Sequence, residues 1–218
     1  MRMNTISLKR IGIYFLGLVI LCLGVVLNTK TNLGVAAING IPYVLANTTS
    51  ISLGTAVLMM YCLFIAVQWL VKKRIDLLTL LQLPISYLFG RMVDVINLYV
   101  LQFEAGSFIE GIVMLAAAII LVALGTTLVV SMNLVPNAPD GLVQTIAGRW
   151  NQSFGKVKLI FDGCCLCIAA IISWLMLGNI IGLGFGTVCS MALTGPLCSW
   201  LKTRFSEWKV LLYSENAV

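Results

Sequence analysis

The residues of this 218-residue chain that could do chemistry are few, and the clearest group lies inside an apolar stretch. It begins with Asn137, continues through Pro139, Asp140 and Gly141, and has Gln144 one turn later. Asn137 is a predicted N-cap, and Pro139 and Asp140 fit the first turn of a short helix, whose free N–H groups attract negative charge. The Asp140 carboxylate could bind a cation or a proton, or could only cap its own helix. The residues alone favour neither reading.

Other polar groups lie in comparable surroundings. Asn32 and Asn39 accompany a first short apolar segment, and Arg91 and Asp94 lie three residues apart on a longer one, so that they share a helix face and can pair. A charge near the bilayer centre costs about 2.5–3.5 kcal/mol on insertion scales and faces the bundle interior. Arg91 and Asp94 therefore form a structural ion pair or compensate charge at a site. The candidate ligand-binding residues are Asn137, Asp140, Gln144, Asn32, Asn39, Arg91 and Asp94, with Gln82 and Asp162 as further buried polar candidates.

Several chemistries are excluded by composition. The chain has no histidine, so Ser-His-Asp and Cys-His nucleophile pairs and HExxH zinc sites are absent. Its seven cysteines lie in apolar stretches without a paired framework, which predicts packing residues rather than disulfides or metal ligands. We therefore expect no enzyme activity, no catalytic residue, no metal and no cofactor.

The elements that position these residues must lie in a bilayer. Hydrophobic residues make up 60% of the chain and charged ones only 10%, whereas a water-facing surface needs about a quarter. Apolar stretches of roughly 18 residues or more, enough to cross about 30 Å of hydrocarbon, recur along the length. Six spans are predicted, at about 11–29, 53–71, 76–101, 109–131, 154–177 and 180–201, with two shorter, broken segments at about 34–47 and 137–148.

The basic residues decide whether the short segments cross. If all eight segments crossed, nine basic residues would lie inside and four outside, with Arg91 uncounted; if the short segments enter and return, twelve lie inside and only Lys30 outside. The second arrangement obeys the positive-inside rule better. We therefore predict an all-α polytopic membrane protein with six full spans, two re-entrant segments and both termini cytoplasmic. The net charge of +6 then reports orientation, and no nucleic-acid partner is expected.

An internal repeat supports this topology. At an offset of 101 residues, ten of the 32 ungapped pairs from 23–54 are identical, where chance gives roughly two or three. With four more residues of shift, Leu88 and Gly90 match Leu193 and Gly195. The single domain 1–218 then divides into repeat A (about 11–101) and repeat B (about 109–203), with a basic cytoplasmic tail at 202–218. Three spans per half make the second half an inverted copy, unless shared Leu and Gly content alone explains the match.

A family resemblance rests on two stretches. Asn32-Leu33-Gly34-Val35 with Ile51-Ser52-Leu53-Gly54-Thr55, and the Gly-rich stretch 182–187 with Leu193-Thr194-Gly195-Pro196, resemble the bacterial YczE/YyaS/YitT-like integral membrane proteins. Members of that family often carry Ser-Pro-Trp-Asp after Leu-Gly-Val, where this chain has Ala36 to Asn39. The resemblance implies a multi-pass bacterial membrane protein and supplies no catalytic residues.

Two functions follow from this sequence. Broken polar segments placed symmetrically in an inverted repeat favour a transporter or permeation component of the plasma membrane, with a midplane site for an unknown small molecule or ion between the repeats. The alternative is a non-transporting accessory protein that holds a partner enzyme or secretion complex at the membrane. The expected partners are the lipid bilayer and the ligand; the sequence leaves open a homo-oligomer or a membrane partner protein.

Overall fold

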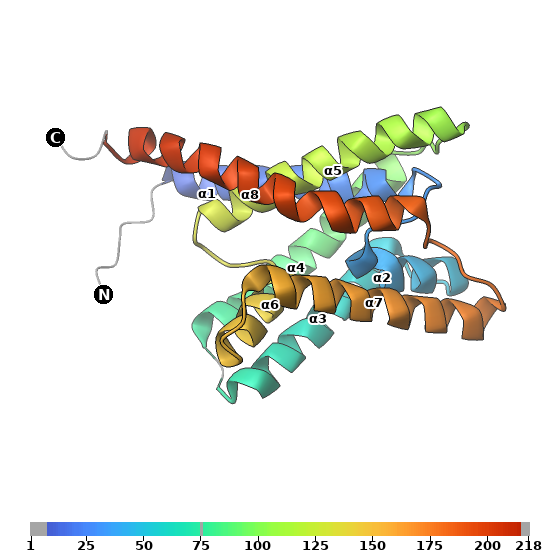
Figure 1. Cartoon of the computed structure of the whole chain (residues 1–218), viewed down its shortest axis with the longest axis horizontal. Coiled ribbons are helices and arrows are strands. Elements are labelled where there is room, and N and C mark those ends of the chain that lie inside the picture. The colour runs from blue at the N-terminus through green and yellow to red at the C-terminus, as the bar shows by residue number, and fades with distance from the viewer. Residues whose placement is uncertain (1–7, 75, 215–218) are drawn as a thin grey trace.

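The computed structural model describes residues 8–74 and 76–214, with side chains as far as residue 205. Within this part of the chain the secondary structure is all helical, which confirms the predicted class (Figure 1). The α-helices are α1 (Leu8–Thr29), α2 (Ala37–Thr48), α3 (Leu53–Lys72), α4 (Leu77–Val95), α5 (Phe108–Ser131), α6 (Ala138–Arg149), α7 (Phe154–Leu177) and α8 (Phe185–Ser214), and a π-helix (Ile96–Val100) follows α4.

Four of the described helices are long and apolar enough to cross a membrane: α1, α3, α5 and α7. The other two predicted spans correspond to α4, which carries Arg91 and Asp94, and to α8. Helix α8 does not end near residue 201 but continues to Ser214, through most of the predicted tail 202–218. Residues 215–218 of that tail lie outside the described residues. A membrane-embedded protein follows from the four apolar helices.

The helices form two layers. Figure 1 shows α1, α5 and α8 in one layer and α2, α3, α6 and α7 in the other, with α4 between them. Helices α1 and α5 cross closely and antiparallel, because glycines remove the side chains between them. A Cβ on Gly24 would lie 2.7 Å from the Val122 nitrogen, and one on Gly125 would lie 2.5 Å from the Leu21 nitrogen. No residue other than glycine fits these two positions without separating the helices.

Helices α2 and α6 are the two short segments, and each follows an extended stretch. Asn32 and Asn133 begin these stretches with left-handed φ angles of 55° and 47°. Arg10 and Tyr14 of α1 hold the second stretch: the Arg10 Nη2 donates to the Met132 carbonyl at 2.6 Å, and the Tyr14 hydroxyl donates to the Val135 carbonyl at 3.0 Å. Helix α2 then packs on α7, and α6 packs on α3.

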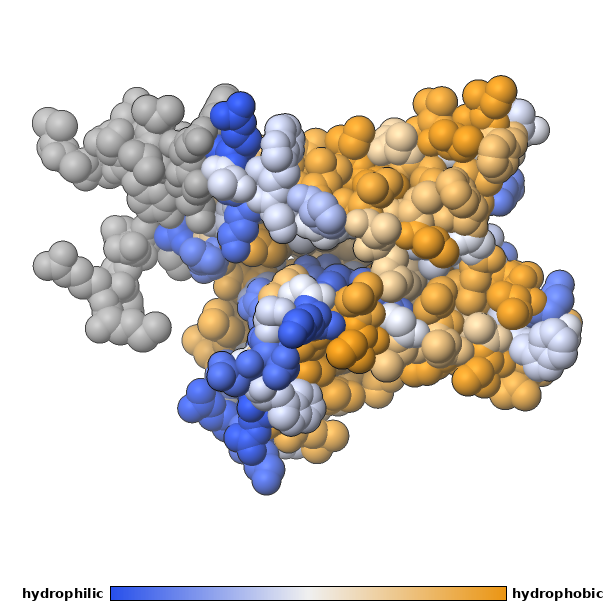
Figure 2. Space-filling view, in the orientation of Figure 1, coloured by the Kyte–Doolittle hydropathy of each residue, from blue (hydrophilic) through white to orange (hydrophobic). Residues whose placement is uncertain are grey.

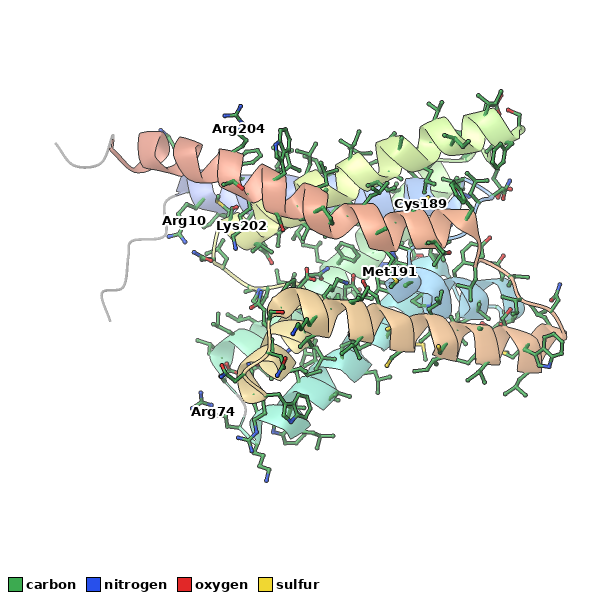
Figure 3. The ribbon with its side chains drawn as sticks, in the orientation of Figure 1. Arg10, Arg74, Cys189, Met191, Lys202 and Arg204 are labelled. Atoms are coloured by element: carbon green, nitrogen blue, oxygen red, sulfur yellow. The ribbon has the colours of Figure 1, made fainter. Side chains whose placement is uncertain are left out.

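Charge separates the two ends of the molecule. Arg10, Arg74, Lys202 and Arg204 lie toward one end (Figure 3). Hydrophilic surface gathers at that end, and hydrophobic surface covers most of the remainder of the visible face (Figure 2). Large apolar side chains such as Leu70 (70% exposed) and Leu175 (77% exposed) point outward, as lipid-facing residues do.

Candidate functional site

The site begins at the N-terminus of α6, where the predicted N-cap is confirmed. The Asn137 Oδ1 accepts a hydrogen bond from the Ala138 N–H at 3.2 Å, and its Nδ2 donates to the Tyr61 hydroxyl at 3.2 Å. Tyr61 lies midway along α3. Helix α6 therefore starts at the middle depth of a helix long enough to span the membrane, which is where a broken helix exposes its free N–H groups.

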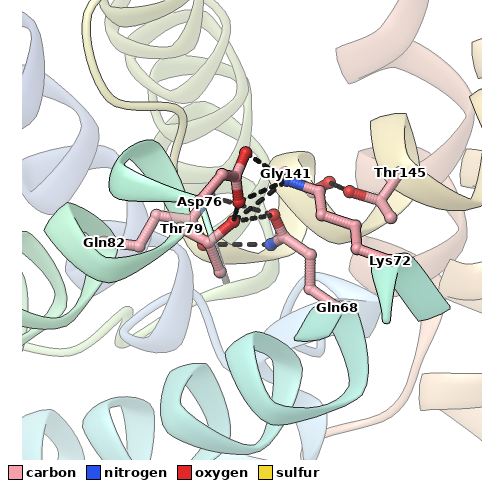
Figure 4. Close-up of polar contacts among 7 residues, drawn as sticks. All are labelled: Gln68, Lys72, Asp76, Thr79, Gln82, Gly141 and Thr145. Atoms are coloured by element: carbon pink, nitrogen blue, oxygen red, sulfur yellow. Dashed lines mark hydrogen bonds and ion pairs between the residues drawn. The ribbon is translucent and has the colours of Figure 1, made fainter. Parts of the chain in front are cut away.

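A buried amide network covers one side of α6 (Figure 4). Gln68 of α3 donates to the Gln82 Oε1 of α4 at 3.0 Å, and each residue is 1% exposed. A Cβ on Gly141 would lie 2.5 Å from the Gln82 Nε2, so glycine at this position lets α6 approach the pair without displacing the Gln82 amide. Toward the helix ends, Lys72 donates to the Thr79 hydroxyl at 2.9 Å. These hydrogen bonds join α3 to α4, and α6 packs against them at Gly141.

Asp140 immediately precedes Gly141 in α6, and its carboxylate has no comparable hydrogen-bond partner in the described part of the chain. Within the described residues, neither a hydrogen-bond donor nor an ion-pair partner binds its carboxylate, and the residue is partly exposed. The charges that act on it are those of Lys158 and Asp162 of α7. Lys158 is already paired with Asp162 at 2.7 Å. Two carboxylates therefore share one ammonium, and the local charge favours a cation or a proton.

The same position in the first half is apolar. A Cβ on Gly40 of α2 would lie 3.0 Å from the Ala169 Cβ and 3.3 Å from the Leu183 Cδ2. At the 101-residue offset, Gly40 matches Gly141, Ala169 matches Gln68 and Leu183 matches Gln82. The α2 contact is closed by methyl groups, whereas the α6 contact is lined by amides. Of these two contacts, only the one at α6 therefore has polar groups that could bind a ligand.

Comparisons with known proteins place the chain in a family. The model of a family of unknown function, DUF6198, matches residues 8–203. The chain belongs to the DUF6198 family. The matched residues include α1 to α7 and about the first two thirds of α8, so the site described above is part of the family domain. No curated protein and no solved structure matches the chain.

In this DUF6198 chain Asp94 has a structural role at the start of α3. Its Oδ1 accepts from the Gly54 N–H at 2.7 Å and its Oδ2 accepts from the Ser52 hydroxyl at 2.8 Å, so it caps the N-terminus of α3. Arg91 lies 3.8 Å from the same carboxylate with its side chain 61% exposed. The structure thus brings this pair to the start of α3 and not to Asp140.

The remaining predicted residues are dispersed. Asn32 is exposed and its Nδ2 donates to the Ala105 carbonyl at 3.2 Å, which fixes a turn. Asn39 is buried in α2 at 4% exposure, and Gln144 is exposed on α6. Of the seven predicted ligand-binding residues, only Asn137 and Asp140 therefore join the polar site at the start of α6.

Four polar residues of this region were not predicted: Arg10, Tyr61, Gln68 and Lys158. Gln68 could have been found from the sequence, since it is an amide inside an apolar span and aligns with Ala169 at the 101-residue offset. The described cysteines are all free, and no group of three or more Cys, Asp or Glu residues within the described part could hold a metal.

Proposed function

We propose that this protein is a multi-pass plasma-membrane transporter or permeation component, and that a small cationic solute or ion binds at the start of α6. The observation that carries the proposal is the Asp140 carboxylate, which has no donor among the described residues and lies at middle depth of the fold beside the Lys158–Asp162 pair. An ionisable group inside a membrane protein marks a ligand or proton path by default. The proposal assigns binding and movement to the chain, not catalysis.

The paired contacts support an inverted repeat within this proposal. In a two-fold arrangement, if residue i meets the copy of j, then j meets the copy of i. Gly24 meets Val122 and Gly125 meets Leu21, which satisfies this rule at an offset of 101. Helices α1 and α5 are antiparallel, so the axis would lie in the membrane plane, as in transporters with inverted repeats.

The basic end supports the proposed orientation. We infer that α4 and α8 also cross the bilayer and that α2 and α6 enter and return, which gives six spans. The end that carries Arg10, Arg74 and Lys202 would then face the cytoplasm, with both termini on that side. The resemblance to YczE/YyaS/YitT-like proteins belongs to the same proposal.

A thermal-shift screen tests the binding function. A ligand that binds only the folded protein stabilises it by about 2.7 kcal/mol at a hundred times its Kd, so purified protein is screened against inorganic cations and small organic amines. We expect at least one cation to raise the melting temperature of the wild-type protein and to lose this effect in Asp140→Asn. Proteoliposomes are then tested for uptake of that cation.

The matched control is Asp94→Asn, which also removes one carboxylate inside the fold but at the α3 cap. This variant should melt at a lower temperature and keep the cation-induced shift. If the shift survives in Asp140→Asn, the site assignment is wrong. If no cation shifts the wild-type protein and a membrane partner copurifies with both variants, the accessory function replaces transport.

A further inference from the structure

Two pairs of glycines that match in the repeat have opposite surroundings. In the first half, α3 and α4 are in close contact: a Cβ on Gly90 would lie 2.7 Å from the Gly54 carbonyl. Asp94 of α4 completes this contact by accepting from the Gly54 N–H at 2.7 Å. The contact joins the beginning of α3 to the second half of α4, at the end of the molecule away from Arg74 (Figures 1 and 3).

The matching pair in the second half has no partner in the described structure. Gly155 is the copy of Gly54 at the 101-residue offset, and Gly195 is the copy of Gly90 in the register shifted by four. A Cβ on either residue would meet no atom within 4 Å. Ser153, the copy of the capping Ser52, is the N-cap of α7 without a side-chain cap hydrogen bond. Helices α7 and α8 thus carry the glycines that match the close α3–α4 contact, but they do not make that contact in this structure.

The gap lies between the two layers. Helix α8 packs on α5 in one layer and α7 packs on α2 in the other, whereas α7 and α8 barely touch. Hydrophilic surface lies in the part of the seam between them that is nearest the basic end (Figure 2). Asp140, Lys158 and Asp162 lie on the α6–α7 side of this seam, and the charge of Asp140 acts on Cys198 of α8 across it.

Glycine inside a helix destabilises it by roughly 0.5–1 kcal/mol relative to alanine. At Gly54 and Gly90 a close helix crossing offsets that cost, since no side chain would fit. At Gly155 and Gly195 nothing in the described structure does so. A conformation in which α7 and α8 meet at these two residues supplies the missing contact.

We propose that the protein has a second conformation, in which α8 docks on α7 through Gly155 and Gly195 as α4 docks on α3 through Gly54 and Gly90. The docking closes the seam that leads from the basic end to Asp140. This inference rests on the inverted repeat of the proposed function and gives it a gate, since alternating access moves one bundle against the other around a fixed site.

The start of α8 is the fixed end of this movement. The Gly186 N–H donates to the Leu33 carbonyl at 2.7 Å, and the Val35 N–H donates to the Gly182 carbonyl at 2.7 Å. Gly182 and Gly178, in the loop before α8, both have a φ of 71°, which favours glycine. The layers therefore stay joined at this loop, and beyond it the part of α8 that carries Gly195 can move toward the start of α7, which carries Gly155.

Disulfide trapping tests the gate in the full-length protein. All seven native cysteines are first replaced by alanine, and Gly155→Cys and Gly195→Cys are then combined in membrane vesicles. A disulfide needs its two Cβ atoms about 3.8 Å apart, so it can form only if α7 and α8 dock. Under a mild oxidant, we expect most of the protein to form an intramolecular disulfide, identified by mass spectrometry of the linked peptides and by loss of maleimide labelling at both positions.

The matched control pair is Gly163→Cys with Gly195→Cys. Gly163 is also on α7 with no atom within 4 Å of its added Cβ, but it lies about 12 Å further along the helix. The proposal predicts little disulfide for this pair. It is overturned if the two pairs react equally, if neither reacts, or if the 155–195 disulfide forms between two chains. The trapping needs no ligand, so its failure would leave cation binding at Asp140 untouched, and loss of that binding would leave the trapping result standing.

Discussion

The crossing of α1 and α5 gives the sharpest test of the packing. Changing Gly24 to Ala adds a Cβ 2.7 Å from the Val122 nitrogen, whereas ordinary van der Waals contact begins near 3.4 Å. The Val122 nitrogen belongs to the backbone, so the helices must separate by about 0.7 Å. Overpacking of this kind destabilises a core by roughly 1–3 kcal/mol.

The matched control removes the effect of helix propensity. Alanine favours a helix over glycine by roughly 0.5–1 kcal/mol at any interior position, including Gly163 of α7, where the added Cβ meets nothing within 4 Å. Gly24→Ala should therefore be about 1–3 kcal/mol less stable than Gly163→Ala. Unfolding in detergent followed by circular dichroism measures this difference, at about 2–4 °C per kcal/mol for a chain of this size.

The two-fold relation between the halves gives a second prediction that the same measurement tests. Gly125→Ala places its Cβ 2.5 Å from the Leu21 nitrogen and should cost about as much as Gly24→Ala. One separation of α1 from α5 relieves both clashes, so the double variant should lose less stability than the sum of the single variants. Equal melting temperatures for Gly24→Ala and Gly163→Ala would refute the close crossing, and full additivity would refute the shared contact.

Three further predictions concern the polar groups. Asp94→Ala removes two hydrogen bonds at the start of α3 and should lower stability by roughly 1.5–3 kcal/mol in thermal unfolding, and a smaller loss would mean that water replaces the cap. Gln82→Leu leaves the buried Gln68 amide short of a partner and should lower stability by about 1–3 kcal/mol. The double variant Gln68→Leu with Gln82→Leu should recover much of that loss. Equal melting temperatures for the single and the double variant would contradict the network. The hydrogen bond from Thr79 lowers the pKa of the Asp76 carboxyl, so its stabilising effect is complete above the unfolded pKa of about 3.9 and is lost as the pH falls through the lower folded value. Asp76→Asn should therefore flatten the acid limb of melting temperature against pH, and an unchanged limb would assign it to other groups.

The helices were largely predictable because their signals are local. Apolar length indicates the long helices, and the N-cap Asn137 with Pro139 indicates the start of α6. The short segments predicted at 34–47 and 137–148 are α2 (Ala37–Thr48) and α6 (Ala138–Arg149). The predicted span 180–201 does not give the end of α8, which continues to Ser214, because basic residues after an apolar run indicate where a membrane ends, and not where a helix ends.

The site was only partly predictable because its contacts are distant in sequence. Arg10 and Met132 are 122 residues apart, and Asn137 and Tyr61 are 76 residues apart, so no local pattern connects them. The Arg91–Asp94 spacing predicts a shared helix face, which the structure has. It does not predict that Asp94 reaches across to the Gly54 N–H of another helix.

The internal repeat carries the information that local patterns lack. Gly40 and Gly141 each pack against residues that match at the 101-residue offset, and the side chains around them differ: Ala169 stands where the other half has Gln68, and Asn39 stands where the other half has Asp140. A carboxylate without a donor is costly to hold inside a membrane protein, and a second copy would repeat that cost without adding a new ligand. The apolar contact at α2 can instead pack tightly and hold the frame against which α6 would bind the cation that we propose. The difference between the halves, rather than their likeness, therefore indicates which residues to mutate first.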